Sequence, residues 1–231
     1  MHKIALFPAV LARAEERRGG LHVHHHLDPR RTAHVVVDLQ NGFMAEGQLS
    51  AVRTAPEIVP NVNRISQALR DAGGLVVYLQ HTADAAAVEG WRNFYDVFVN
   101  PARRAGMIEA FTPGNFGHDL WPGLDVRPED LKVRKSRFGA FIQGSSDLHT
   151  LLQARGIDTL IITGTVTNVC CESTARDAMM LDYRVFFVAD GNAAHTDEEH
   201  NATLSAMANI FCDVVGTEEM VALVNASVPN A

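Results

Sequence analysis

The segment DTLIITGTVTNVCCESTARDA, residues 158–178, indicates the fold class, because it joins an apolar strand to a helix through a short turn. Residues 158–163 are short, β-branched and bounded by Gly164, which is typical of a parallel strand buried on both faces. From Cys170 to about residue 183, alanine, methionine, leucine and threonine recur at helical spacing. The segment therefore predicts a strand-turn-helix unit of an α/β protein, with a cysteine in the first turn of the helix.

Cys170 lies where a thiol can become a nucleophile. In the first turn of a helix, free backbone amides and the positive end of the helix dipole favour a thiolate, so we expect its pKa to lie below the ordinary value of about 8.5. Thr167 or Asn168 is expected to cap this turn with a side-chain oxygen. The same amides can hold an oxyanion. The alternative is that Cys170 is a small buried apolar residue, as most cysteines of α/β proteins are.

The other two of the three cysteines are expected to be structural. Cys171 points about 100° away from Cys170 around the helix and is expected to face the interior. Cys212 lies in the apolar run IFCDVV and is expected to be part of the core. A third hypothesis is a redox pair of Cys170 and Cys171, although adjacent cysteines rarely form a useful bridge and no C-x-x-C spacing is present.

Composition limits the classes of function. The chain has 231 residues, of which 47% are hydrophobic and 20% charged, and a formal net charge of -7. This balance, with no basic stripe, argues against a nucleic-acid partner. No apolar run approaches the roughly 18 residues that cross a bilayer, and the odd number of cysteines fits a reducing compartment. We therefore expect a cytoplasmic protein without a membrane partner, built as an N-terminal arm (residues 1–29) and a single domain (residues 30–231).

Strand-like and helix-like segments alternate along the chain, which is typical of a parallel sheet covered by helices on both faces. The predicted strands are residues 34–38, 74–80, 131–133, 158–163, 184–189 and 210–215. The predicted helices are residues 56–72, 145–155, 170–183, 197–208 and a last helix from residue 217. Residues 81–128 show no regular pattern and carry most of the aromatic side chains, so we expect a long functional cover over a site.

Three ionisable residues are expected at the carboxyl edge of this sheet, where parallel sheets place their active sites. Asp38 follows three valines, where a carboxylate is costly unless it is paired or catalytic. Lys135 follows the third predicted strand and Cys170 follows the fourth. If these strands are neighbours, a thiol, a base and a cation converge into a nucleophile set. Alternatively, Asp38 and Lys135 form a structural ion pair.

Three motifs together carry a family resemblance: VVDLQNGFM near the start, VRKSRFGAF in the middle, and GTVTNVCCESTARDA. In their order and spacing the chain resembles the isochorismatase-like cysteine hydrolases over about residues 30–224. The resemblance implies a three-layer, Rossmann-like αβα fold with a six-stranded, mostly parallel sheet. It implies a catalytic triad of Asp38, Lys135 and Cys170, a cis peptide between Thr165 and Val166, and an oxyanion hole formed by the amides of Val166 and Cys170.

The resemblance also implies a reaction, namely hydrolysis of an amide through a thioester. Metal-dependent nicotinamidases carry an Asp-x-His pair after the second strand, whereas this chain reads QHTAD, so no catalytic metal and no cofactor are expected. Members that cleave isochorismate lack the cysteine that is present here. The nucleophile motif is similar to that of ureidoacrylate amidohydrolases, so the expected substrate is a small ureido or carbamoyl compound. The alternatives are a non-catalytic binding module and an isochorismatase-type hydrolase on the same fold.

Substrate contacts are expected from polar residues near the motifs and from aromatic residues of the irregular stretch and of the middle motif. The polar candidates, which could instead satisfy turn backbone, are Gln40, Asn41 and Asn168. The aromatic candidates are Trp91, Phe94, Tyr95, Phe138 and Phe141. Arg137 could meet a substrate carboxylate or be a solvated charge. Residues 22–26 contain four histidines without ligand spacing, which favours a surface arm over a metal site. The resemblance implies a homo-oligomer, with an arm that packs across a neighbouring subunit.

Overall fold

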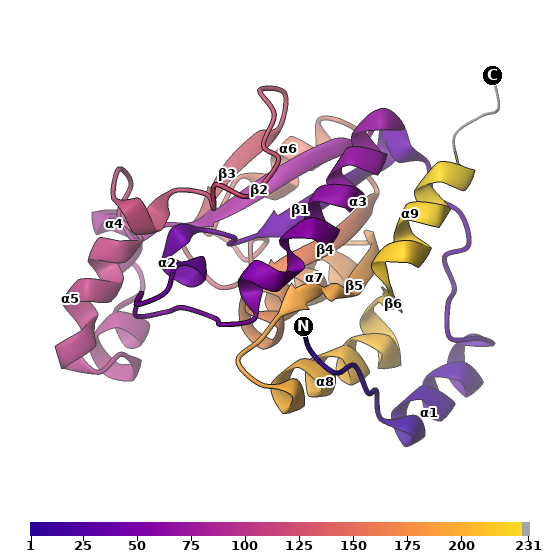
Figure 1. The fold of residues 1–231 in the computed structure, drawn as a ribbon, viewed down its shortest axis with the longest axis horizontal. Coiled ribbons are helices and arrows are strands. Elements are labelled where there is room, and N and C mark those ends of the chain that lie inside the picture. The colour runs from indigo at the N-terminus through magenta and orange to yellow at the C-terminus, as the bar shows by residue number, and fades with distance from the viewer. Residues whose placement is uncertain (228–231) are drawn as a thin grey trace.

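The computed structural model describes residues 1–227, and residues 228–231 of the predicted domain lie outside this part. Within it, one sheet has the strand order β3-β2-β1-β4-β5-β6, and every pair of neighbouring strands is parallel. The strands are β1 (Thr32–Val37), β2 (Leu75–His81), β3 (Leu131–Lys135), β4 (Thr159–Thr165), β5 (Arg184–Ala193) and β6 (Asp213–Val215). The chain therefore builds the predicted six-stranded sheet (Figure 1).

Helices connect and cover these strands. They are α1 (Pro8–Arg18), α2 (Asn41–Met44), α3 (Val59–Asp71), α4 (Ala85–Glu89), α5 (Pro101–Ala110), α6 (Leu148–Gln153), α7 (Glu172–Met180), α8 (Asp197–Ala206) and α9 (Thr217–Ala226). Short 3-10 turns span Pro29–Arg31, Ala55–Ile58 and Phe116–His118, and wider π turns span Asn93–Phe98, Thr167–Cys171 and Met207–Phe211. Among the described residues, no helix is both long and apolar enough to cross a membrane.

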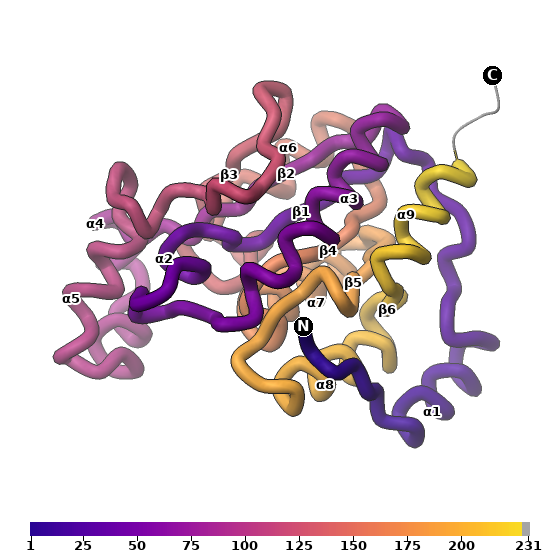
Figure 2. Tube along the Cα trace, viewed as in Figure 1, coloured from indigo at the N-terminus to yellow at the C-terminus, as the bar shows by residue number. Residues whose placement is uncertain are grey.

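The molecule has three layers. Helices α3 and α9 contact each other on one face of the sheet (Figure 2). Ile65 and Met220 are fully buried there. Helices α6, α7 and α8 bring Leu148, Ala175 and Leu204 into the core on the other face. All six residues of β1 are buried, as expected for a central strand covered on both sides. The predicted αβα, Rossmann-like fold with helices on both faces is confirmed.

Two expectations about individual elements are wrong. Residues 81–128 are not irregular, because they form α4, the turn Asn93–Phe98 and α5 beyond the carboxyl ends of the strands. Helix α5 buries none of its side chains, so its sequence has no strong apolar stripe to reveal it. The last strand does not begin at residue 210, because the π turn Met207–Phe211 continues α8 and β6 starts only at Asp213.

The N-terminal arm packs on its own chain, and its contact with a neighbouring subunit stays a prediction. The backbone amide of Ala5 donates to Asn201 Oδ1 at 2.7 Å, and that of Phe7 donates to Ser205 Oγ at 2.9 Å, so the arm lies along α8. Farther on, the amides of Val23 and His24 donate to the buried carboxylate of Asp213 at 2.8 and 2.7 Å. These backbone contacts explain how the histidine-rich segment is held.

Gly164 sets the geometry of the sheet where β1 and β4 end. Its φ of 130° is rarely adopted by residues with a side chain, and a Cβ at this position would collide with the backbone of Val37. Strand β4 therefore approaches β1 closely just before the chain leaves β1 at Asp38 and β4 at Val166. Glycine is required here because this close approach fixes the relative positions of the next residues on both strands.

Candidate active site

The residues that follow β1, β3 and β4 meet at the carboxyl edge of the sheet. Asp38 comes directly after β1, Lys135 is the last residue of β3, and Cys170 lies in the turn after β4. Strands β1 and β4 are neighbours, but β2 lies between β1 and β3. Lys135 reaches Asp38 across this strand, because its long side chain brings Nζ to 2.7 Å from Oδ2 of Asp38. The structure thus brings the three residues together.

Asp38 and Lys135 form an ion pair whose side chains are completely buried. Burial raises the pKa of Asp38, although the Lys135 charge and the nearby Cys170 thiol act in the opposite direction. Burial alone would lower the pKa of Lys135, but the adjacent Asp38 carboxylate raises it overall, so the ammonium persists. Lys135 also donates to the carbonyl of Arg137 at 3.0 Å. A carboxylate with a raised pKa is a better proton acceptor than an ordinary one.

Asp38 has an uncommon backbone conformation. Its φ is 53°, in the left-handed region that residues other than glycine rarely adopt. Its amide donates to the carbonyl of Leu79 at 3.1 Å, which ties this turn to β2. Rare conformations persist where the surrounding structure enforces them, and they cluster at functional sites. Here the chain turns away from the direction of β1 at Asp38, and the Asp38 carboxylate faces Lys135.

Cys170 is 3% exposed, and its ionisation differs from the expectation. Burial raises the pKa of the thiol to about 12, the Asp38 charge adds to this effect, and Lys135 opposes it. The predicted depression of its pKa is therefore wrong. The reason is positional, since Cys170 lies in the apolar π turn Thr167–Cys171 and α7 begins only at Glu172. The resting site holds a neutral thiol within hydrogen-bonding reach of Asp38.

The nucleophile turn is held by hydrogen bonds to α8 and β5 and not by a side-chain cap. It follows a cis peptide between Thr165 and Val166, and Val166 begins the turn without a capping side chain, so the expected cap is wrong. Instead, Thr167 Oγ1 lies 2.9 Å from Nδ1 of His200, while His200 Nε2 lies 3.0 Å from the carbonyl of Ala189. Since that carbonyl can only accept, Nε2 carries the proton and the Thr167 hydroxyl donates to Nδ1.

The arm extends this support. The ring of His2 stacks on that of His200 with centroids 4.3 Å apart, and burial lowers the pKa of His200 to about 4. His200 is therefore neutral at physiological pH, as its role as an acceptor from Thr167 requires. No sequence motif predicted a role for either histidine, because the contact joins the first residues of the chain to α8. Their position indicates that they help to hold the nucleophile turn in place.

A partly enclosed cavity of about 70 Å³ lies beside Cys170. Its lining is predominantly aromatic and aliphatic and consists of Phe43, Ser50, His81, Phe94, Tyr95, Met107, Phe111, Phe138, Val166, Val169 and Cys170. A bound water needs about 10–15 Å³ of such space, so the cavity has room for roughly five to seven small groups. A small molecule can fit beside the thiol, and a drug-sized ligand cannot.

Only part of the predicted aromatic set lines this cavity. Phe94, Tyr95 and Phe138 do so. Trp91 lies behind them, stacked on Phe94 with centroids 4.4 Å apart. Phe141 packs on Tyr183 at 5.6 Å and does not contribute to the lining. Trp91 and Phe141 therefore pack behind or beside the cavity, and a substrate contact for either stays a prediction.

The predicted polar contacts also differ from the structure. Gln40 donates to the carbonyls of His81 and His118 at 3.1 and 2.9 Å and accepts from the His81 amide at 2.7 Å, so its side chain joins two loops. Asn41 donates to the carbonyl of Phe116 at 2.9 Å. Neither of them, nor Asn168, lines the cavity, and a substrate contact at these three positions stays a prediction.

Sequence reasoning missed six lining residues, namely Phe43, Ser50, His81, Met107, Phe111 and Val169. Two of them carried a usable signal, because Phe43 lies in the motif after Asp38 and His81 ends β2 at the active edge of the sheet. Val169 directly precedes the predicted nucleophile. Met107 belongs to α5 and Phe111 follows it. No hydrophobic periodicity in the sequence predicted that helix.

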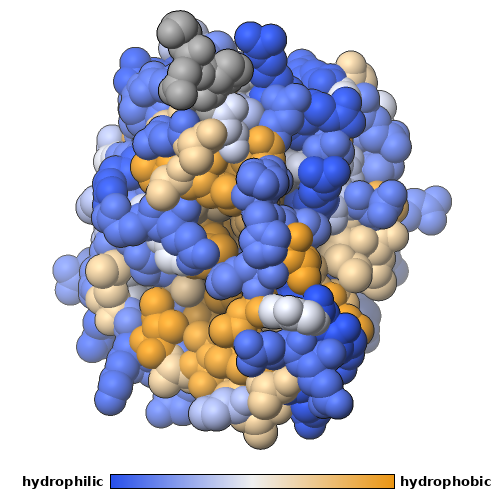
Figure 3. All heavy atoms as spheres, turned by 90° about the vertical axis from the view of Figure 1, so that its right-hand side faces the viewer, coloured by the Kyte–Doolittle hydropathy of each residue, from blue (hydrophilic) through white to orange (hydrophobic). Residues whose placement is uncertain are grey.

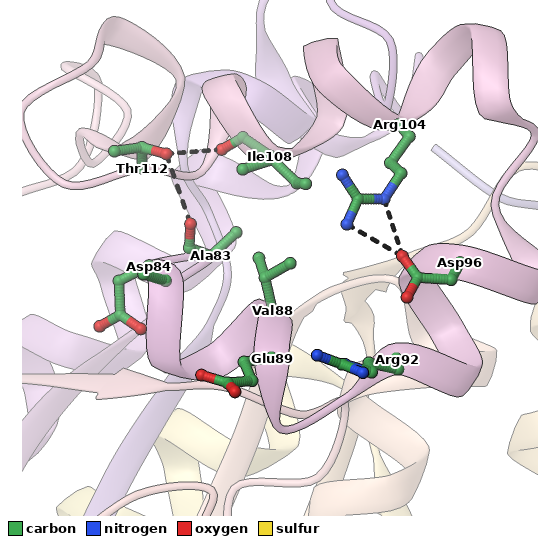
Figure 4. A pocket seen from close by; sticks show the side chains of 10 residues that line it. Ala83, Asp84, Val88, Glu89, Arg92, Asp96, Arg104, Ile108 and Thr112 are labelled. Carbon is green, nitrogen blue, oxygen red and sulfur yellow. Dashed lines mark hydrogen bonds and ion pairs between the residues drawn. The ribbon is translucent and has the colours of Figure 1, made fainter.

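A larger surface hollow of about 600 Å³ lies between α4, the turn Asn93–Phe98 and α5 (Figure 4). In it Arg104 pairs with Asp96 at 2.9 Å, and Thr112 donates to the carbonyl of Ile108 at 2.8 Å. Neither Cys170 nor any other predicted site residue contributes to its lining. The smaller cavity is the candidate active site, because it alone of these two has the thiol in its wall.

Comparisons with known proteins agree with this geometry. Residues 32–219 match the model of the isochorismatase domain. A probable inactive nicotinamidase of Arabidopsis thaliana is 37% identical over 187 residues, which cover 78% of this chain and 90% of that protein. A ureidoacrylate amidohydrolase of Pantoea ananatis is 32% identical over 213 residues, covering 81% of this chain and 83% of the relative.

A solved structure supports the same assignment. The crystal structure of a cysteine hydrolase from Pseudomonas syringae pv. phaseolicola has a TM-score of 0.78 and 29% identity, and the match covers 87% of this chain and 95% of that one. Fold and site together define a hydrolase with a three-layer αβα fold and a buried cysteine at the carboxyl edge of a parallel sheet. The chain belongs to the isochorismatase family, which confirms the resemblance seen in its three motifs.

Proposed function

We propose that this chain is a cysteine-dependent amidohydrolase that cleaves a C–N bond of a small ureido or carbamoyl compound through a thioester. The observation that carries the proposal is the buried Asp38–Lys135 pair beside a thiol in the wall of a partly enclosed cavity. A buried ion pair gives little net stability compared with apolar packing, so a catalytic role accounts for it better than a structural one. The similarity to a ureidoacrylate amidohydrolase supports the substrate class.

In the first half of the proposed reaction, Asp38 accepts the thiol proton while Cys170 attacks the carbonyl carbon of the substrate. The backbone amides of Val166 and Cys170 donate to the developing oxyanion, and both residues belong to the cavity wall. Asp38 then gives its proton to the departing nitrogen, the C–N bond breaks, and the acyl group remains on sulfur. Because the pKa of the thiol is raised to about 12, proton transfer must accompany attack instead of preceding it.

In the second half, Asp38 accepts a proton from water as the water attacks the thioester. The carbon–sulfur bond breaks, the proton returns to sulfur, and the acid product leaves. Lys135 stays charged throughout, holds the carboxylate in place and stabilises its ionised form. No metal or cofactor takes part in this scheme. Within residues 1–227, no three His, Cys, Asp or Glu side chains are grouped as if to hold a metal ion.

The proposal is tested by measuring ammonia release from ureidoacrylate analogues, biuret, N-carbamoyl amino acids and nicotinamide, with the parent and with Cys170→Ser. We expect turnover of at least one ureide that disappears in the variant and survives a metal chelator. Turnover that the chelator stops would contradict the metal-free scheme. Silence across the panel, together with a Cys170 that alkylating reagents do not modify, would favour a non-catalytic binding module, in line with the inactive relative.

The ionisation of the site predicts a particular pH profile. Asp38 must be ionised to accept a proton and burial raises its pKa, so the acid limb of kcat/KM is expected above the ordinary carboxyl value of about 3.9. Above that limb the rate should be level from about pH 7 to about pH 10, because the thiol is neutral throughout this range. A rate that instead rises about tenfold per pH unit in this range would indicate a preformed thiolate.

We also propose that the protein is a cytoplasmic homo-oligomer. Its three cysteines are free and buried, as a reducing compartment allows. On the face of the molecule that carries α9, apolar side chains are exposed between hydrophilic ones (Figure 3). Val23 and Ile210, which are 40% and 46% exposed, line a surface hollow of about 290 Å³, and a second subunit would cover such apolar surface. Sedimentation of the purified protein tests this proposal, and a monomer at micromolar concentration would contradict it.

A further inference from the structure

Two of the residues that line the active-site cavity carry a buried polar group without a hydrogen-bond partner among the described residues. The hydroxyl of Tyr95 and Nδ1 of His81 are buried and make no hydrogen bond with any described residue. Tyr95 is 1% exposed and His81 is 6% exposed, and both line the cavity beside Cys170. Leaving a buried polar group without a partner is unfavourable. A substrate that bonds to these two groups would remove this cost, so they are suited to recognise it.

Both groups are uncharged in the resting protein. Burial lowers the pKa of His81 well below its ordinary value, and the nearby charge of Lys135 lowers it further. Burial raises the pKa of Tyr95 to about 12. At neutral pH the cavity therefore offers a phenol that can donate or accept and an imidazole that does one of each on its two nitrogens. Groups of this kind complement an amide or ureide, which has both N–H donors and a carbonyl acceptor.

No charged side chain of the described residues lines the cavity. The charges of Asp38 and Lys135 lie behind Cys170 and are paired with each other. Arg137, which the sequence suggested for a substrate carboxylate, donates to the carbonyls of Ser136 at 2.8 Å and Gly90 at 2.6 Å. Its guanidinium also lies over the ring of Trp91, outside the lining. A carboxylate in the cavity would thus be desolvated without a cation to pair with, which is strongly unfavourable.

We propose that this cavity selects neutral amides or ureides over anionic ones, and that Tyr95 and His81 recognise the uncharged polar group of the substrate. The inference rests on the proposed function and narrows its substrate class, because it excludes compounds that place a carboxylate in the cavity. Flat, uncharged groups also suit the walls formed by Phe43, Phe111 and Phe138, against which an amide plane can stack. The small volume restricts the buried part to a few heavy atoms.

Two alkylating reagents test this selection without any need for turnover. Iodoacetamide and iodoacetate have nearly the same shape, but the first is a neutral amide and the second an anion. The rate at which each modifies Cys170 is measured by mass spectrometry and divided by its rate with N-acetylcysteine amide, an uncharged free thiol. Cys170→Ser gives the background from Cys171 and Cys212. We expect the normalised preference for iodoacetamide to be at least about tenfold, since the anion meets no cation in the cavity.

The recognition by Tyr95 is tested with Tyr95→Phe. Loss of one hydrogen bond should slow modification by iodoacetamide about fivefold and leave that by iodoacetate unchanged. Tyr183→Phe is the matched control, because the Tyr183 hydroxyl bonds to His149 at 3.0 Å outside the cavity, and it should change neither rate. Equal normalised rates for the two reagents, or no modification by the neutral one, would overturn the proposal. Either result leaves the amidase assignment to be judged separately by ammonia release.

Discussion

Replacing Cys170 by alanine is expected to lower the rate of amide hydrolysis by about 10⁴-fold or more while leaving the fold intact. The proposed reaction has no route without the sulfur, because the acyl group must pass through it. The structural effect should be small, since a single buried atom is removed, which costs about 1 kcal/mol. The measurement is ammonia release from the best substrate of the panel, with unfolding in urea followed in parallel.

Cys171 provides the control for this variant. It is the next residue in the same π turn and is fully buried in the core between the sheet and helices α6, α7 and α8. Cys171→Ala should cost a similar amount of stability and retain activity within a few-fold. If both variants lost activity equally, packing of the turn would explain the loss and the nucleophile assignment would fail. A reversible loss of two thiols on mild oxidation would point instead to a redox pair.

Replacing Lys135 by methionine is expected to reduce both stability and activity. The variant leaves Asp38 buried without its partner, which should lower the free energy of unfolding by about 3–5 kcal/mol at neutral pH. Since burial raises the pKa of Asp38, and losing the cation raises it further, the unpaired carboxyl takes up a proton as the pH falls. The loss should therefore be smaller under mildly acidic conditions, and denaturation at two pH values measures it.

The double variant Asp38→Asn, Lys135→Met separates a catalytic pair from a structural one. With neither charge present, nothing is left uncompensated in the core, so most of the lost stability should return. Activity should not return, because no base remains to accept the thiol proton. A double variant that regained both stability and turnover would identify the pair as purely structural and contradict the proposed mechanism.

The sequence predicted the frame of the site because its signals are local. Valines before Asp38 and β-branched residues before Gly164 mark buried parallel strands, and such strands place the next residues at one edge of the sheet. It did not reveal that β2 separates β1 from β3, because strand order depends on contacts between distant segments. The ion pair forms nevertheless, because the Lys135 side chain is long enough to reach Asp38 across β2.

The sequence predicted the ionisation of Cys170 and the wall of the cavity less well. A position near a helix start suggested a depressed thiol pKa, but the pKa depends on burial, which the turn sequence does not express. Gln40 looked like a substrate contact because it follows Asp38, whereas its amide joins two loops. Met107 and Phe111 were unforeseen because α5 exposes most of its surface and lacks a periodic apolar stripe.

The mass of the protein during turnover tests the central claim most directly. The reaction of the best ureide with the parent enzyme is quenched in acid at times within the first turnovers, and the modified peptide is located by fragmentation. The account predicts a transient increase equal to the mass of the acyl group, carried by Cys170. Turnover with Cys170 unmodified at every time point, or an adduct on any other residue, would contradict it.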